Sequence, residues 1–167
     1  MNMRDAEMES VIEELAPDII RFCRGLAGGA EAGDDVAQEA LTALIRRWRK
    51  SGAPDSPASY AYAAARRIDR RRRWRRRLFT PLEPWAADRA PAAEAEALER
   101  GVALREALEA LHCLAPGDRE ALLLSAVSGL GVEEASRCLG LSASAYKMRV
   151  HRARARLASR LEVCHAG

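Results

Sequence analysis

Apolar residues recur every three or four positions over most of the chain, and this spacing predicts helices with one buried face. In the first predicted helix, residues 8 to 26, the stripe consists of Val11, Leu15, Ile19 and Phe22. Pro17 falls inside this segment and predicts a kink or a helix boundary. No segment shows a convincing strand pattern, so we expect an all-α protein.

Glycines and acidic residues mark the start of a second helix. The loop predicted before it is marked by Gly25, Gly28, Gly29 and Gly33. Asp34 and Asp35 then stand where a helix N-terminus favours negative charge. The apolar stripe of the helix that they start consists of Val36, Ala40, Leu44 and Trp48. We expect this stripe to pack on the first helix.

A third helix is predicted after a turn at residues 51 to 59, which contains two prolines and a glycine. It begins near Ala58, and its buried side consists of Tyr62, Ala65 and Ile68. The helix continues into the segment from Arg66 to Arg77, in which nine of twelve residues are arginine. Residues 78 to 100 contain three prolines and many alanines, which is typical of a linker between two domains.

The C-terminal part of the chain predicts a helix-turn-helix. A helix that leads into it carries Val102, Leu104, Leu108 and Leu111. Residues 118 to 161 then read as helix, glycine turn, helix, glycine turn and a long basic helix. The apolar face of the last helix consists of Tyr146, Val150, Ala153, Leu157 and Leu161. Its cationic face consists of Lys147, Arg149, Arg152, Arg154, Arg156 and Arg160. This arrangement is usual for a DNA-reading helix-turn-helix.

The turn before the last helix predicts which side chains meet DNA. Gly140 and Ser142 suit a turn followed by an N-cap, so the first turn of the helix would enter the major groove. The residues expected to face base edges are Ser144, Ala145, Lys147, Met148 and Arg149. Arg152 and Arg156 lie farther along and are expected to hold phosphates. A solvated helix surface is the alternative interpretation of this face.

The net charge of +3 conceals four blocks of alternating sign. Residues 1 to 45 carry 3 basic and 10 acidic side chains, and residues 46 to 77 carry 13 basic and 2 acidic ones. Residues 78 to 121 carry 4 basic and 9 acidic, and residues 122 to 167 carry 7 basic and 3 acidic. Two separate cationic segments predict two contacts with a polyanion, whereas the acidic segments suit a basic protein surface.

The arginine run predicts a salt-sensitive attraction to nucleic acid, because each cation that neutralises a phosphate releases a counterion. A disordered basic tail is the alternative, but the run continues an amphipathic helix and includes Trp74. Trp74, with Tyr60 and Tyr62, offers flat surfaces on which unpaired bases stack, worth about 1–3 kcal/mol per base. Core packing is the competing interpretation of all three aromatic side chains.

Composition argues against several other classes of protein. The apolar runs are far too short for a membrane span and no signal peptide is evident, so we expect a cytoplasmic protein without membrane insertion. The cysteines are scattered and predict neither a disulfide framework nor a metal site: Cys23, Cys113, Cys138 and Cys164. No histidine has a nucleophile partner at a suggestive spacing, and no glycine-rich phosphate loop follows a strand. We therefore expect no catalysis and no cofactor.

Three segments, in this order, resemble a bacterial RNA polymerase sigma factor of the extracytoplasmic-function (ECF) group. DDVAQEALTALIRRW, which begins at Asp34, resembles the region-two helix that docks on the polymerase clamp. YAAARRIDRRRR, which begins at Tyr62, resembles the helix that contacts the melted promoter −10 element. Residues 114 to 157 resemble region four, which reads the −35 element. The ordered succession of three motifs is far more specific than any one of them.

The resemblance implies two small helical domains joined by a flexible linker: region two at residues 1–77, an acidic linker at 78–101 and region four at 102–167. The implied polymerase-binding residues are Asp35, Gln38, Glu39 and Leu41. The implied −10 contacts are Tyr62, Arg66, Arg67, Asp69, Arg70, Arg71, Arg73 and Trp74. The −35 contacts would be the groove-facing and phosphate-facing residues of the last helix named above. The implied partners are core RNA polymerase, through its clamp and flap surfaces, promoter DNA and an anti-sigma factor.

The sequence departs from the family pattern at several reading positions. Ala135 and Ser136 stand where the family commonly has Ile-Ala, and Ala143 to Arg149 replace a segment that commonly contains Thr and Ser. Ala58 and Ala65 replace a tryptophan and an asparagine often found before the Ile-Asp pair. The resemblance therefore carries over neither a −35 sequence preference nor the details of −10 base capture.

Two other functions compete with the sigma-factor interpretation. An autonomous helix-turn-helix repressor or activator would explain the C-terminal half, but it leaves the arginine helix and the DDVAQE segment unexplained. A recombinase or nuclease with a DNA-binding tail would need a carboxylate or Ser/Tyr site, which the sequence does not offer.

Overall fold

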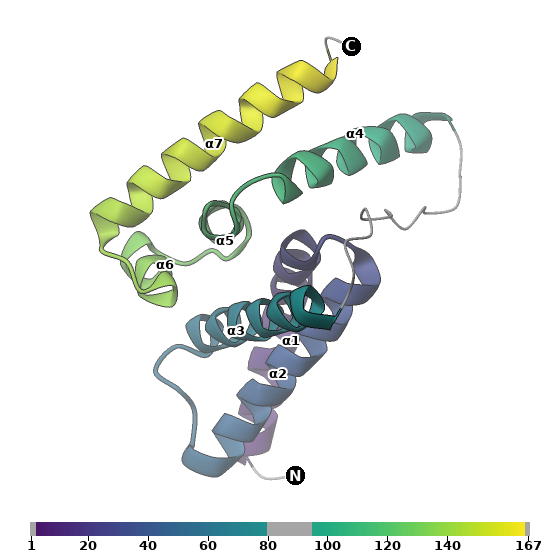
Figure 1. Cartoon of the computed structure of the whole chain (residues 1–167). Coiled ribbons are helices and arrows are strands. Elements are labelled where there is room, and N and C mark those ends of the chain that lie inside the picture. Colours follow the sequence, from purple (N-terminus) through teal and green to yellow (C-terminus); the bar gives the residue numbers. More distant parts are fainter. Residues whose placement is uncertain (1–2, 80–94, 166–167) are drawn as a thin grey trace.

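The computed structural model describes residues 3–79 and 95–165. Within these ranges the structure is entirely helical, as expected from the sequence, and it forms two helical units (Figure 1). The first unit consists of α1 (Met3–Ala27), α2 (Ala30–Ser51) and α3 (Pro57–Phe79). The second consists of α4 (Ala95–His112), α5 (Pro116–Val127), α6 (Val132–Leu139) and α7 (Ala143–His165). Most of the predicted linker, residues 80–94, lies outside the described residues.

The core of the first unit follows the predicted stripes. All four apolar residues predicted for the second helix are buried, and so are Ile19 and Phe22 of α1. The predicted buried side of α3 is confirmed, because Tyr62 and Ala65 are fully buried and Ile68 is nearly so. The rings of Phe22 and Tyr62 meet edge to face with their centroids 5.0 Å apart. Helices α1 and α3 are thereby fixed against each other.

The predicted break at Pro17 does not occur, because α1 runs through this residue from Met3 to Ala27. Pro17 is exposed, while Met8 on one side of it and Ile19 on the other are buried in the same core. A proline removes one backbone hydrogen bond from a helix, but residues packed on both sides hold the helix together.

The glycine-marked loop between the first two helices is shorter than predicted. Only Gly28 and Gly29 form the turn, where Gly28 has a φ of 87°, whereas Gly25 lies in α1 and Gly33 in α2. A Cβ on Gly33 would lie 2.5 Å from Arg24 Cα, so this glycine permits close approach of the two helices. Asp34 and Asp35 consequently lie in the second turn of α2 and not at its N-terminus.

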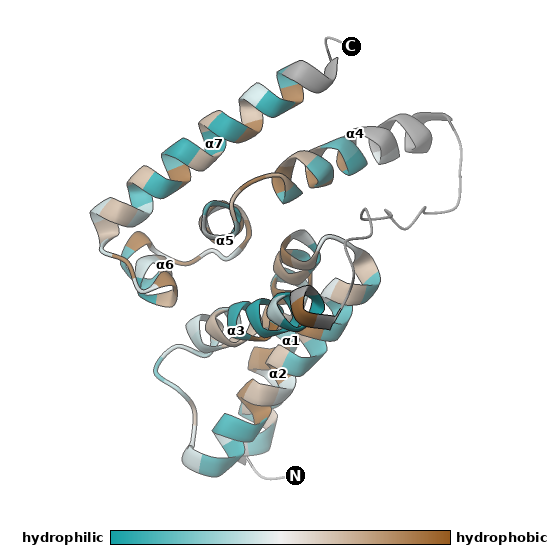
Figure 2. Ribbon diagram, viewed as in Figure 1, coloured by the Kyte–Doolittle hydropathy of each residue, from teal (hydrophilic) through white to brown (hydrophobic). Residues whose placement is uncertain are grey.

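The helix-turn-helix is confirmed as predicted. Gly140 ends α6 in the left-handed conformation, with φ 67° and ψ 35°. Ser142 caps α7, because its Oγ accepts the Ala145 N–H at 3.2 Å. On α7, Tyr146 and Val150 are buried against Ala121 and Ala135 of α5 and α6. Hydrophilic and hydrophobic residues both occur along α7 in Figure 2, as an amphipathic helix requires.

Helix α4 begins at Ala95, seven residues before the predicted start at Val102. The end of the predicted linker, AEALER, is rich in strong helix formers, and their propensity extends the helix toward the N-terminus. Among the described helices, none combines the length and the apolar character needed to cross a membrane.

The two units pack on each other through a shared hydrophobic core. This core joins Leu26 of α1 with Leu111 of α4 and Leu123 of α5. A Cβ on Gly25 would lie 2.6 Å from Leu123 Cδ2, so the Leu123 side chain packs directly on the backbone of α1 at this glycine. The sequence predicted two units but carried no signal of the surface between them.

A buried arginine of the second unit extends the same contact. Arg119 Nη1 donates a hydrogen bond to the Leu26 carbonyl at 3.2 Å and lies 2.7 Å from His112 Nδ1. The carbonyl belongs to the last turn of α1, where the helix dipole favours a cation. Burial, and to a lesser extent the adjacent Arg119 guanidinium, lower the pKa of His112 to about 4.

Close packing between α1 and α2 predicts opposite effects for two helical glycines. Gly33→Ala should destabilise the protein by about 1–3 kcal/mol, because its Cβ would meet backbone that cannot move aside. Gly101→Ala is the matched control, since nothing lies within 4 Å of the added Cβ and alanine is the better helix former. It should stabilise by about 0.5–1 kcal/mol. Urea unfolding measures both changes, and a neutral Gly33→Ala would contradict the packing.

The lowered pKa of His112 predicts a pH-dependent stability. The unfolded chain binds the proton near pH 6.5 and the folded chain only near pH 4, so stability is lost as the pH falls through this interval. The loss should be about 1 kcal/mol after allowance for partial exposure. Thermal unfolding of His112→Gln should therefore depend less on pH than unfolding of the wild type. His151→Gln, on the exposed face of α7, is the control, and equal pH slopes in all three proteins would contradict the prediction.

Candidate functional site

The predicted arginine run is helical along its length, because α3 continues from Pro57 to Phe79. The arginines divide into two groups. Four of them make ion pairs: Arg66, Arg71, Arg72 and Arg73. Four others are exposed and form no ion pair with any described residue: Arg67, Arg70, Arg75 and Arg76. Of the eight arginines of the run whose side chains the structure describes, half are thus held by the protein and half remain available to an external anion.

Trp74 lies on the exposed side of α3. Its side chain is 63% exposed, which favours the surface interpretation over core packing. Arg67, Arg70 and Trp74 follow one another at steps of three and four, so they share one face of the helix. A flat aromatic surface between guanidinium groups suits an unpaired base with its phosphates.

Two residues of the predicted −10 set have no surface to offer. Tyr62 and Asp69 are both 0% exposed, so neither presents a surface to a nucleic acid in this conformation, unlike the direct contacts that the resemblance implied. They are seven residues apart and therefore occupy the same, buried side of α3. Asp69 lies 2.9 Å from Arg73 Nε, and burial raises the pKa of its carboxyl group although Arg73 opposes the shift.

The predicted polymerase-binding residues lie beside the arginine helix. Asp35 and Gln38 are exposed on α2, whereas Glu39 and Leu41 are half-buried. Glu39 makes ion pairs with Arg71 and, at 3.0 Å, with Arg72. Asp35 lies 3.5 Å from Arg72. The α2 carboxylates and the arginines of α3 therefore line one groove.

The first turns of α7 expose most of the side chains that were predicted to meet DNA. Ser144, Ala145, Lys147 and Met148 are exposed, and Met148 is 58% exposed despite its apolar side chain. Arg149 is half-buried, with its guanidinium next to Gly117. Farther along, Arg152 is exposed, and Arg156 is paired with Asp118 of α5.

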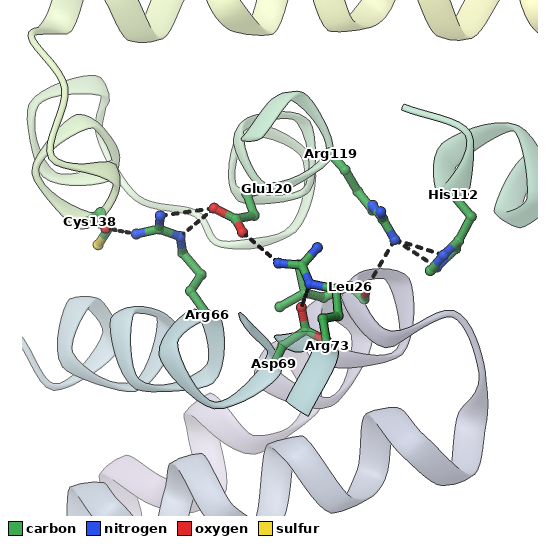
Figure 3. A network of polar contacts seen from close by, with 8 residues as sticks. All are labelled: Leu26, Arg66, Asp69, Arg73, His112, Arg119, Glu120 and Cys138. Carbon is green, nitrogen blue, oxygen red and sulfur yellow. Dashed lines mark hydrogen bonds and ion pairs between the residues drawn. The ribbon is translucent and has the colours of Figure 1, made fainter. Parts of the chain in front are cut away.

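The contact between the units includes a carboxylate that sequence analysis missed. Glu120 of α5 lies between two arginines of α3 (Figure 3). Its Oε2 accepts a hydrogen bond from Arg66 Nε at 2.9 Å, and its Oε1 accepts one from Arg73 Nη2 at 3.1 Å. Arg66 also donates to the carbonyl of Cys138 in α6. Arg66 and Arg73 are 54 and 47 residues away from Glu120 in the sequence, so no local pattern links them. The only related signal in the sequence is the net negative charge of residues 78 to 121.

A second carboxylate joins α6 to the start of α3. Glu134 accepts hydrogen bonds from the hydroxyls of Ser56 and, at 2.6 Å, Ser59. These two bonds lower the pKa of the Glu134 carboxyl group. Ser56 also caps α3, since its Oγ accepts the Ser59 N–H at 3.1 Å. The described residues include no group of three or more His, Cys, Asp or Glu side chains placed to hold a metal ion.

Two family models match the two helical units. The model of sigma-70 region 2 matches residues 11–77, and the model of sigma-70 region 4 matches residues 104–157. The first match ends within α3, and the second runs from α4 to α7.

Curated relatives and solved structures agree with these matches. The ECF RNA polymerase sigma factor SigD of Mycobacterium tuberculosis is 34% identical over 90% of this chain and 74% of its own length. The RNA polymerase sigma-E factor of Streptomyces antibioticus is 31% identical over 93% of this chain and 85% of its own length.

The fold is shared with two sigma factors solved in complexes. One is RpoE from Bartonella quintana bound to the anti-sigma factor NepR, with a TM-score of 0.73, 22% identity, and coverage of 94% of this chain and 98% of that one. The other is CnrH bound to the cytosolic domain of CnrY, with a TM-score of 0.69, 22% identity, and coverage of 95% and 90%. The chain therefore belongs to the extracytoplasmic-function sigma factors of bacterial RNA polymerase.

Proposed function

We propose that this transcription initiation factor binds core RNA polymerase and directs it to promoters by contacting −10 and −35 DNA. The observation that carries the proposal is the presence of two cationic helix faces in one chain, α3 and α7. The face on α3 includes an exposed tryptophan, which suits unpaired bases, and the other begins a helix-turn-helix, which suits a duplex. A repressor of duplex operators would have no use for the first face.

The −10 surface proposed here is narrower than the set taken from the family resemblance. Its members are the exposed Arg67, Arg70 and Trp74, extended by Arg75 and Arg76. Arg66, Arg71 and Arg73 carry charges that are already paired with carboxylates. Tyr62 and Asp69 support the surface from within, because they fix α3 against α1 and hold Arg73.

The −35 surface comprises the exposed first turns of α7. Ser144, Lys147 and Arg149 supply hydrogen-bonding groups for base edges, and Ala145 and Met148 supply apolar contacts. Arg152 and Arg156 lie one and two turns farther and hold phosphates, once Arg156 leaves Asp118. Ala145 and Met148 stand where the family commonly has Thr and Ser, so the family's −35 sequence preference does not carry over to this chain.

Polymerase binding is assigned to α2. Asp35 and Gln38 are the exposed members of the predicted set, and Glu39 and Leu41 support them from half-buried positions. A basic clamp surface would meet carboxylates here, and such charge complementarity raises association rates. Region four would meet the flap surface, with region two at residues 1–77, the linker at 78–101 and region four at 102–167.

An anti-sigma partner and a cytoplasmic location complete the proposal. The solved sigma factors with this fold were captured with NepR and with CnrY. Because this chain has the same fold and belongs to the same family, we expect an anti-sigma protein to bind it as well. A factor that binds promoters acts on chromosomal DNA, which in bacteria lies in the cytoplasm.

Run-off transcription with core RNA polymerase tests the proposed function. Wild-type protein should co-elute with core polymerase in gel filtration and support transcription from its promoter. Asp35→Arg with Gln38→Ala should abolish both, because it places a cation on the surface assigned to the clamp, while the thermal unfolding temperature stays near that of the wild type. Glu13→Arg, a charge reversal at an exposed position of α1, is the matched control and should behave as the wild type.

The opposite outcome identifies the competing function. If the isolated chain bound a duplex operator tightly and sequence-specifically but neither co-eluted with core polymerase nor supported transcription, it would be an autonomous helix-turn-helix regulator.

A further inference from the structure

Met148 is the side chain that α7 points most directly away from the protein. Tyr146 and Val150, each two residues from it, are buried against α5 and α6. Two residues of an α-helix span about 200°, so Met148 lies on the side of α7 opposite to this core. Its side chain is accordingly 58% exposed. A helix that enters a major groove with this face forward places Met148 at the deepest point of the groove.

The neighbours of Met148 on this face leave it uncovered. Ser144 and Ala145 precede it by four and three residues, which places them on the same face one turn earlier. Both are exposed and both have small side chains, so the methionine extends beyond them. Lys147 and Arg149 adjoin it in sequence and therefore lie about 100° to either side. The centre of the face is thus apolar and its flanks are cationic.

Packing within the protein does not explain an apolar side chain at this position. Met148 belongs to neither of the two hydrophobic clusters of the described residues. In the major groove every base pair presents hydrogen-bonding groups, and thymine adds a methyl group. A methionine has no donor to offer to the O6 and N7 acceptors of guanine, whereas it packs favourably on a methyl group. The position therefore favours one kind of base edge over the others.

We propose that Met148 is a specificity-determining residue, which selects a thymine at the base pair it faces in the −35 duplex by packing on the thymine 5-methyl group. This assignment rests on the proposed function, because it requires that α7 enter the major groove. It adds to that function the base that one position of the −35 element must contain. A G·C pair there is disfavoured, because the methionine would strip water from the guanine acceptors without replacing their hydrogen bonds.

Two variants separate the apolar contact from the size of the side chain. Met148→Leu keeps an apolar side chain, whereas Met148→Gln has a similar length and flexibility but carries an amide. Leu104→Gln is the matched control, because Leu104 is 61% exposed and lies on α4. All three variants should unfold at nearly the same temperature as the wild type, since each replaced side chain is exposed.

Selection from a promoter library measures the base preference. Each full-length protein is combined with core RNA polymerase, and the holoenzyme is used to retain promoters whose −35 and −10 regions are randomised. The wild type, Met148→Leu and Leu104→Gln should enrich thymine at the same position of the −35 region, about tenfold or more over guanine or cytosine. Met148→Gln should lose this enrichment and favour adenine there, because glutamine pairs with adenine N6 and N7.

Deoxyuridine substitution isolates the methyl group. Each thymine of the enriched −35 element is replaced singly by deoxyuridine, which removes the 5-methyl group and leaves base pairing intact. At the position that Met148 faces, this loss should weaken binding by the wild-type holoenzyme about two- to fivefold and leave binding by the Met148→Gln holoenzyme unchanged. Anisotropy of a fluorescent promoter gives both affinities, and the double-mutant cycle assigns the contact to one side chain and one methyl group.

Two results would overturn this assignment and leave the proposed function intact. If Met148→Gln kept the thymine enrichment, or if deoxyuridine weakened its binding as much as that of the wild type, another residue would read the thymine. If Met148→Gln kept its fold but no longer co-eluted with core polymerase in gel filtration, Met148 would contact protein and not a base. A wild-type holoenzyme without any preference in the −35 region would contradict both the assignment and the −35 contact on which it rests.

Discussion

The dense positive charge of one helix is the constraint on which the rest of this structure depends. Nine arginines within twelve residues repel one another, and α3 remains an ordered helix because carboxylates approach it from several directions. Glu39 and Asp35 come from α2, Asp69 from α3 itself and Glu120 from the second unit. The acidic blocks of the sequence thus supply several of the carboxylates that neutralise this basic helix.

Neutralisation is incomplete, and the unpaired arginines form the nucleic-acid surface that we propose. The arginines on the buried and flanking sides of α3 are paired, while those beside Trp74 are exposed and leave a cationic face with an aromatic surface in it. A polyanion can compete for the paired arginines as well, since each of their carboxylates offers the same oxygens as a phosphate. Under the proposed function, the same ion pairs that order the helix would therefore limit how much of it a nucleic acid can contact.

Local sequence patterns predicted most of the helices. The features that they missed depend on contacts between residues that are far apart in the sequence. The stripes of α2 and α7, the turn at Gly140 and the cap at Ser142 follow from nearest neighbours along a helix, so the sequence suffices for them. Gly25 and Gly33 are predicted to lie in a loop because glycine is a poor helix former. In the structure both lie in helices, where the missing side chain lets Leu123 approach Gly25 and α1 approach Gly33. Tyr62 and Asp69 were matched by residue type, and only the packing of α3 shows that both are buried. Glu120 has no local signal, because its partners are about fifty residues away.

Site-specific crosslinking from the exposed face of α3 measures whether this helix contacts unpaired bases of a promoter. Trp74 is replaced by a photoreactive benzoyl-phenylalanine, and the protein is combined with core polymerase and a promoter whose −10 region is held open by mismatches. We expect crosslinks to unpaired bases of the −10 region, and none when the photoreactive residue replaces Glu13 on α1. Crosslinks from position 74 that reach only protein or fully paired DNA would contradict it.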